Sequence, residues 1–99
     1  MALSHLDFRC LISVADDYES VTEIKRMLKN RDGLNVMDEE IVTSLSRLVK
    51  ASLVTAYVYD PAQQQYILAP NDQHERAKKW FWITSAGLEY LNKNQPFDK

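Results

Sequence analysis

Residues 38–59 of the chain read DEEIVTSLSRLVKASLVTAYVY, and the hydrophobic pattern changes its period within this stretch. In the first part, apolar residues recur at i, i+4, i+7 and i+8, the spacing of one helix face; they are Ile41, Leu45, Leu48 and Val49. After Ser52 the residues are mainly β-branched and aromatic, as in a strand. The sequence therefore predicts a helix over 38–51 that is followed at once by a strand over 53–59.

Two further helices are predicted before this stretch. Ser4 is positioned to cap the first of them. Residues 20–23 (SVTE) form a capping box at the start of the second, which spans residues 21–30 and ends before Gly33. A short connector then leads to the helix at 38–51, so the last two helices have the arrangement of a helix-turn-helix.

A second strand and a short last helix are predicted near the end of the chain. Residues 80–84 (WFWIT) have the composition of a strand. Roughly 20 mostly polar residues, interrupted by residues 66–68 (YIL), separate the two strands, and so long a connection is expected to be functional or mobile. Thr84 then caps the last helix, in which Leu88 and Leu91 lie one turn apart.

Side chains alternate between the two faces of a strand, which places Trp80 and Trp82 on one face of the second strand and Phe81 and Ile83 on the other. If Phe81 and Ile83 enter the core, the tryptophans face outward. Either residues 66–68 or the first helix then covers them, or they form an interaction surface together with Tyr57 or Tyr59.

The composition limits the classes of protein to which the chain can belong. Its 99 residues correspond to a single domain, with 45% hydrophobic and 26% charged residues. The net charge of −2 excludes a generic basic nucleic-acid-binding protein but leaves room for a local basic face. No apolar run is long enough for a membrane span, and the N-terminus lacks a secretory signal. The lone Cys10 fits a reducing compartment, so we expect a cytoplasmic protein without membrane association.

The sequence contains no pattern typical of catalysis or of metal or cofactor binding. His5 and His74 lie too far apart to suggest a metal pair, and no cysteine or second histidine flanks either. Cys10 falls on an apolar helix face and is expected to pack as a small hydrophobic residue. There is also no glycine-rich phosphate loop and no nucleophile elbow. We therefore expect a non-enzyme that needs no metal and no cofactor.

Two short motifs stand where a helix meets a strand. Residues 48–54 (LVKASLV) lead from the third helix into the first strand, and residues 82–91 (WITSAGLEYL) lead from the second strand into the last helix. They resemble two motifs of the PadR-like and MarR-like winged-helix regulators, a helix ending Leu-x-x-x-Gly-Leu-Ile and a wing ending Leu-Thr-x-x-Gly-x-x-x-Leu. The residues that match the second motif position by position are Ile83, Thr84, Gly87 and Leu91.

The resemblance spans roughly residues 6–91 and implies an α+β winged helix-turn-helix, with a three-helix core, a C-terminal β-hairpin wing and a short final helix. The chain departs from the first motif because Ser52 occupies the usual glycine position. A serine with positive φ is strained relative to glycine, so we expect this turn to be built differently.

The function that the resemblance implies is sequence-specific DNA binding by a small transcription regulator. Residues 38–51 would lie in the major groove, and the hairpin tip would contact the backbone or the minor groove. The candidate contacts on the third helix are Thr43, Ser44, Arg47 and Lys50. The candidate phosphate contacts near the second helix are Lys25, Arg26, Lys29 and Arg31, and those on the wing are Arg76, Lys78 and Lys79.

The acidic start of the third helix argues against DNA. A recognition helix usually meets bases with its N-terminal half, and here that half begins with residues 38–40 (DEE). Helix capping and the helix dipole explain these acids without any role in recognition. The alternative function is therefore a winged-helix adaptor that binds another protein and not DNA.

Surplus apolar surface predicts a homodimer. Apolar residues cover more than half of the first helix, and the last helix adds more. One core of this size is not expected to cover all of them, and large uncovered apolar patches usually mark an interface. We expect a two-fold dimer whose interface is formed by Phe8, Leu11, Ile12, Ala15, Leu88 and Leu91.

Overall fold

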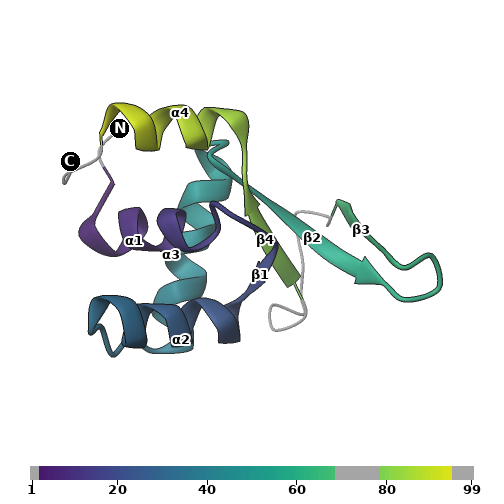
Figure 1. The fold of residues 1–99 in the computed structure, drawn as a ribbon, viewed down its shortest axis with the longest axis horizontal. Helices are drawn as coiled ribbons and strands as arrows, with labels where there is room; N and C mark the ends of the chain where they lie inside the picture. The colour runs from purple at the N-terminus through teal and green to yellow at the C-terminus, as the bar shows by residue number, and fades with distance from the viewer. Residues whose placement is uncertain (1–2, 69–78, 95–99) are drawn as a thin grey trace.

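The computed structural model describes residues 3–68 and 79–94, which form four helices and one four-stranded antiparallel sheet (Figure 1). The helices are α1 (His5–Ser13), α2 (Val21–Asp32), α3 (Asp38–Lys50) and α4 (Ser85–Lys93). The strands are β1 (Glu19–Ser20), β2 (Val54–Asp60), β3 (Gln65–Leu68) and β4 (Lys79–Ile83). The predicted α+β winged helix-turn-helix fold is confirmed.

The ends of the helices follow the local sequence signals. The Ser4 hydroxyl accepts a hydrogen bond from the Asp7 amide at 3.0 Å, and the Ser20 hydroxyl accepts one from the Glu23 amide at 3.3 Å. Gly33 adopts the left-handed conformation with φ of 69°, and its amide donates to the carbonyl of Lys29. Ser4 therefore begins α1, and Ser20 and Gly33 bound α2, as predicted; α2 runs to Asp32, two residues beyond the predicted range of 21–30.

The sheet contains one more hairpin than the sequence predicted. The strand order is β1-β4-β2-β3, so β4 pairs with one edge of β2 and β3 pairs with the other. Residues 66–68 had been assigned to a long polar connection, and this prediction was wrong. Asp60 and Pro61 end β2 in a tight turn, after which the β-prone residues Tyr66 and Ile67 pair back onto it. The β2–β3 hairpin forms a wing that extends away from the helices (Figure 1).

The hydrophobic core lies between the helices and one face of the sheet. Leu45 and Leu48 from α3 are at most 1% exposed, as their helical spacing predicted. Phe81 and Ile83 of β4 are also buried, so the prediction that these two residues enter the core is confirmed. The opposite face of β4 carries Trp80 and Trp82, which are half-buried.

The turn between α3 and β2 contains a residue in the left-handed conformation, although this residue is a serine. Ser52 has φ of 64°, so the expectation of a differently built turn was wrong. The amide of Ser52 donates to the carbonyl of Val49, and the amide of Leu53 donates to that of Leu48, each at 3.0 Å. These two bonds define a Schellman motif. They hold the left-handed conformation against the steric preference of the serine.

Replacing Ser52 with glycine is expected to stabilise the protein by about 0.5–1 kcal/mol. Glycine adopts positive φ without the steric cost that a Cβ atom carries, and this gain exceeds its larger entropy loss on folding. Urea denaturation of the wild type and of Ser52→Gly would measure the difference. An equal or lower midpoint in the variant would contradict the strain at this position.

Thr84 connects the start of α4 to the end of α3. Its hydroxyl accepts a hydrogen bond from the Gly87 amide at 3.0 Å and donates one to the carbonyl of Ser52 at 2.8 Å. Gly87 is equally constrained, because a Cβ atom there would lie 2.3 Å from the carbonyl oxygen of Leu53. The Thr84 cap and the close packing at Gly87, both predicted from the second motif, are confirmed.

Candidate nucleic-acid interface

The outer face of α3 carries most of the residues predicted to read bases. Thr43, Arg47 and Lys50 are exposed. Ser46 is exposed as well and was missed by the sequence analysis. Serine is common on solvated helix faces, so its type gave no signal.

Ser44 does not belong to this face. Its side chain is fully buried, so the prediction that it contacts DNA was wrong. Ser44 lies three residues after Ile41 and four before Leu48, which places it on the apolar side of the helix. There its hydroxyl donates a hydrogen bond to the Asp7 carboxylate of α1.

Asp7 joins α1 to α3 through a buried carboxylate. Only 3% of the residue is exposed, yet the carboxylate is well satisfied. Arg47 approaches in bidentate fashion, with Nε 3.1 Å from Oδ2 and Nη2 2.8 Å from Oδ1. The Ser4 amide adds a bond of 3.3 Å to Oδ2. The one signal of this role in the sequence is that Asp7 is a charged residue within the broad apolar face of the first helix.

The environment of Asp7 favours its ionised form. Burial by itself would raise the pKa of the Asp7 carboxyl. The hydrogen bonds from Arg47, Ser44 and Ser4 outweigh burial and hold this pKa below its ordinary value. Asp7 therefore carries its negative charge throughout the physiological pH range.

The depressed pKa of Asp7 makes part of the stability depend on acid pH. This contribution is fully present above the unfolded-state pKa of about 3.9 and is lost as the pH falls through the lower pKa of the folded state. Urea unfolding of the wild type and of Asp7→Asn between about pH 2 and pH 7 should show a stability difference that shrinks below about pH 4. A difference that stays constant down to the lowest pH would contradict this assignment.

Some of the basic side chains of α2 already form ion pairs, which a phosphate would have to replace. Lys25, Arg26 and Lys29 are exposed, although Lys25 pairs with Asp38 at 3.3 Å and Arg26 pairs with Glu23. Exposed pairs of this kind are weak and can be exchanged for phosphate contacts. Within residues 3–68 and 79–94, Lys29 and Lys50 form no ion pair.

Arg31, the fourth basic residue predicted near the second helix, also takes part in the packing of α2 on α1. Its guanidinium binds the Asp32 carboxylate, with Nη2 2.6 Å from Oδ2, and donates to the Ser13 hydroxyl at 3.0 Å. Arg9 of α1 lies 3.4 Å from the same carboxylate. The hydrogen bond from Arg31 is the main reason that the pKa of Asp32 is lowered. Arg31 is thus part of a charged link between the two helices.

The acidic start of α3 is only partly explained by capping. The Glu40 carboxylate accepts a hydrogen bond from the Met37 amide at 2.9 Å, and Asp38 makes the ion pair with Lys25. Glu39 is exposed and makes no ion pair with the described residues. The first turn of α3 is therefore the most acidic part of the helix.

Of the three basic residues predicted for the wing, only Lys79 is described, and it lies on β4 rather than in the β2–β3 hairpin. Lys79 begins β4 and is half-buried opposite Val58 of β2. Arg76 and Lys78 lie outside the described residues.

Aromatic side chains cover the face of the sheet that points away from the core. Tyr18, from the loop after α1, stacks on Tyr66 with ring centroids 3.9 Å apart and contacts Trp82 at 4.6 Å. Tyr66 in turn lies 5.6 Å from Trp80. Of residues 66–68, Tyr66 thus helps to cover the tryptophans, as one of the two interpretations held, whereas Ile67 and Leu68 are exposed. The main contribution of Tyr18 was not foreseen, because it stands in a polar run.

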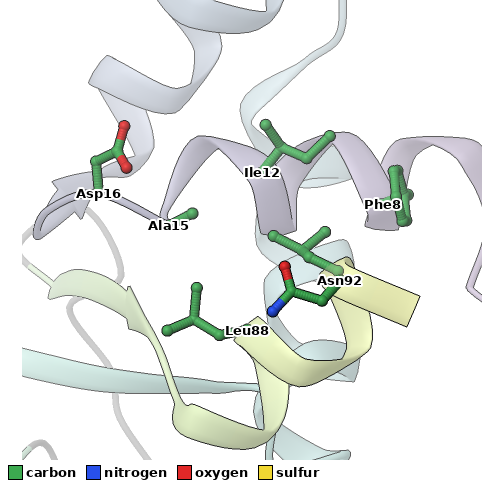
Figure 2. Close-up of a pocket in the computed structure, with 7 residues that line it drawn as sticks. Phe8, Ile12, Ala15, Asp16, Leu88 and Asn92 are labelled. Atoms are coloured by element: carbon green, nitrogen blue, oxygen red, sulfur yellow. The ribbon is translucent and has the colours of Figure 1, made fainter. Parts of the chain in front are cut away.

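An apolar groove lies between α1 and α4 and holds most of the residues predicted for a dimer interface. It has a volume of about 290 Å³ and is lined by Phe8, Ile12, Ala15, Asp16, Leu88, Leu91 and Asn92 (Figure 2). Leu88 is 47% exposed, whereas Leu91 is only 7% exposed and packs in the core. Leu11 is fully buried among core residues. The prediction that Leu11 is an interface residue was therefore wrong, whereas Leu91 lines the groove.

The described residues contain neither a metal site nor a reactive thiol. They contain no group of three or more potential metal ligands. Burial raises the pKa of the Cys10 thiol to about 11, so this thiol stays protonated and unreactive at neutral pH. No helix in the described part of the chain is both long and apolar enough to cross a membrane.

The chain is similar in structure to three solved winged-helix proteins. No family model and no curated protein matches its sequence. A PadR family transcription regulator from Clostridium difficile superposes over 91% of this chain and 82% of its own, with a TM-score of 0.66 and 15% identity. A PadR-like transcriptional regulator from Bacillus cereus superposes over 89% of this chain and 75% of its own, with a TM-score of 0.66 and 19% identity.

The third similar structure is Bacillus subtilis PadR in complex with operator DNA, with a TM-score of 0.67 and 16% identity. It covers all of this chain, which spans 53% of the length of that protein. At these identities the similarity concerns the fold. The chain thus has the winged helix-turn-helix fold of the PadR family transcription regulators.

Proposed function

We propose that the chain is a small, cytoplasmic, non-enzymatic transcription regulator that binds double-stranded DNA. The observation that carries this proposal is the exposed outer face of α3 in a winged-helix fold. In such folds this helix enters the major groove. The Bacillus subtilis PadR structure, which has a similar fold, was solved with operator DNA.

The proposed contacts divide into base contacts and phosphate contacts. Thr43 and Arg47 on α3 are proposed to face bases, and Lys50 stands next to them on the same side. Phosphate contacts are proposed for three exposed basic residues of α2 and for the basic residues at positions 76–79; these are Lys25, Arg26, Lys29, Arg76, Lys78 and Lys79. Because these cations are few, the affinity should be modest and should fall steeply with salt.

Fluorescence anisotropy with genomic and random duplexes at two salt concentrations tests this function. Replacing Arg47 with alanine should cost about 1–3 kcal/mol of binding free energy for the preferred duplex and relax the preference at one base pair. Lys93→Ala is the matched control, since Lys93 is an exposed cation at the far end of α4. Equal affinity of the wild type and Arg47→Ala for every duplex would contradict the proposed role of α3.

A specific observation favours the second candidate, a winged-helix adaptor that binds a protein. The residues at the start of α3 are acidic and exposed, and DNA phosphates on both sides of a groove would repel them. They are Asp38, Glu39 and Glu40. A wild-type protein that binds no duplex even at low salt would favour the adaptor.

We also propose that a second copy of the chain covers the groove between α1 and α4. Leu88 is exposed beside the half-buried side chains of Phe8, Ile12 and Ala15, which together offer an apolar surface for a two-fold contact (Figure 2). A two-fold dimer would present two α3 helices to two half-sites. Light scattering at micromolar protein should give twice the monomer mass, and Leu88→Glu should give a monomer. A monomeric wild type would contradict the dimer.

A further inference from the structure

The guanidinium of Arg47 presents only one of its two hydrogen-bonding edges to solvent. The edge formed by Nε and Nη2 is used by the Asp7 carboxylate. The other edge, formed by Nη1 and the second N–H group of Nη2, contacts no acceptor among the described residues. The Arg47 side chain is 48% exposed, which fits a group with one edge held and the other open.

Asp7 itself is fixed before any ligand arrives. Its carboxylate also accepts bonds from the Ser44 hydroxyl and the Ser4 amide, and its own amide donates to the Ser4 hydroxyl. An arginine side chain usually loses much rotamer freedom when it binds. Because Asp7 already restrains Arg47, less freedom remains to be lost on binding.

Pairing with Asp7 also changes which kind of acceptor Arg47 binds best. The negative charge of Asp7 largely cancels the positive charge of Arg47, so the pair attracts a phosphate weakly. The free edge still carries two parallel N–H donors, the geometry that matches O6 and N7 of guanine. Directional bonds to a neutral base depend less on net charge than a phosphate contact does.

We propose that Asp7 is a positioning residue that holds Arg47 for bidentate recognition of a guanine in the major groove. This inference rests on the proposed DNA-binding function. Through Arg47, a residue of α1 thus affects the base specificity of α3, although Asp7 is itself too buried to contact DNA. Arg47 contributes mainly to base preference, and the exposed lysines contribute to general affinity.

Anisotropy titrations with Asp7→Asn test the proposal against duplexes that carry guanine or adenine at the preferred position. A bidentate arginine–guanine contact corresponds to a preference of about 5- to 150-fold, and Asp7→Asn should remove most of it. The same variant should bind random duplexes more tightly, because Arg47 is no longer neutralised. The slope of log affinity against log salt should steepen by about 0.9 as one more phosphate contact forms.

Two further variants separate positioning from a purely structural role. Ser44→Ala removes a bond to Asp7 but leaves the Arg47 pair intact, so the guanine preference should persist. Arg47→Lys keeps the charge that neutralises Asp7 but cannot present two parallel donors, so the preference should be lost. If Asp7→Asn does not fold, Asp7→Glu tests the positioning instead, because it keeps the negative charge but moves the carboxylate, so the guanine preference should fall.

Failure of the positioning role and failure of the proposed DNA-binding function give different results. Uniformly weaker binding of Asp7→Asn to all duplexes, with an unchanged guanine preference and salt slope, would overturn the positioning role. An unchanged guanine preference in Arg47→Lys would overturn it as well. A wild-type protein that binds no duplex would overturn the proposed function, and the inference with it.

Discussion

The Leu45→Ala variant is expected to lose about 2–5 kcal/mol of unfolding free energy. Leu45 is 1% exposed at the centre of α3, so its truncation leaves a cavity that neighbouring side chains can fill only in part. A domain of this size has a total stability of about 5–15 kcal/mol. The loss should therefore be visible as a large drop in Tm, measured by circular dichroism.

Leu88→Ala provides a matched control for this measurement. The same atoms are removed from a leucine that is 47% exposed on α4, so a monomer should change by only about 0.5 kcal/mol. Both variants should be compared at a concentration at which any dimer is dissociated. A wild-type Tm for Leu45→Ala would mean that the buried face of α3 has been assigned wrongly.

Replacing Gly87 with alanine is expected to destabilise the protein by about 3 kcal/mol. The new Cβ atom would lie 2.3 Å from the Leu53 carbonyl oxygen and 2.5 Å from Cγ1 of Ile83. The first neighbour is backbone and cannot rotate away. The start of α4 would have to move away from the turn that connects α3 to β2.

Gly33→Ala separates this clash from an effect of backbone conformation. Gly33 has φ of 69°, but a Cβ atom there would meet nothing within 4 Å. Its replacement should therefore cost only the strain of a left-handed alanine, about 1–2 kcal/mol. Chemical denaturation of both variants should place Gly87→Ala clearly below Gly33→Ala. The reverse order would contradict the close packing of α4.

Much of the fold could be predicted because its signals are local. The helical period of Ile41, Leu45 and Leu48 depends on spacing alone, and a cap such as Ser20 acts on an amide three residues away. The β3 strand escaped prediction because only two of its residues, Tyr66 and Ile67, are β-prone and their pairing partners lie on β2. Such pairing depends on the tertiary fold.

The residues of the site were harder to predict because their roles depend on partners far apart in sequence. Asp7 and Arg47 are separated by 40 positions, and neither type reveals that the other faces it. Ser44 was misassigned because a serine can face either water or a buried acceptor. Leu11 was misassigned for a related reason: a wide apolar arc has the same pattern whether a second copy or the core of the same chain covers it.

Mapping the amide chemical shifts of the labelled protein during titration with a duplex tests most directly whether the outer face of α3 binds DNA. We predict the largest shifts along α3, from Thr43 to Lys50, with smaller shifts around Lys25 and Lys29 of α2. Amides beside the groove between α1 and α4 should not respond to the duplex. Shifts confined to that groove, or no shifts at saturating duplex and low salt, would contradict a DNA-binding role for this winged helix.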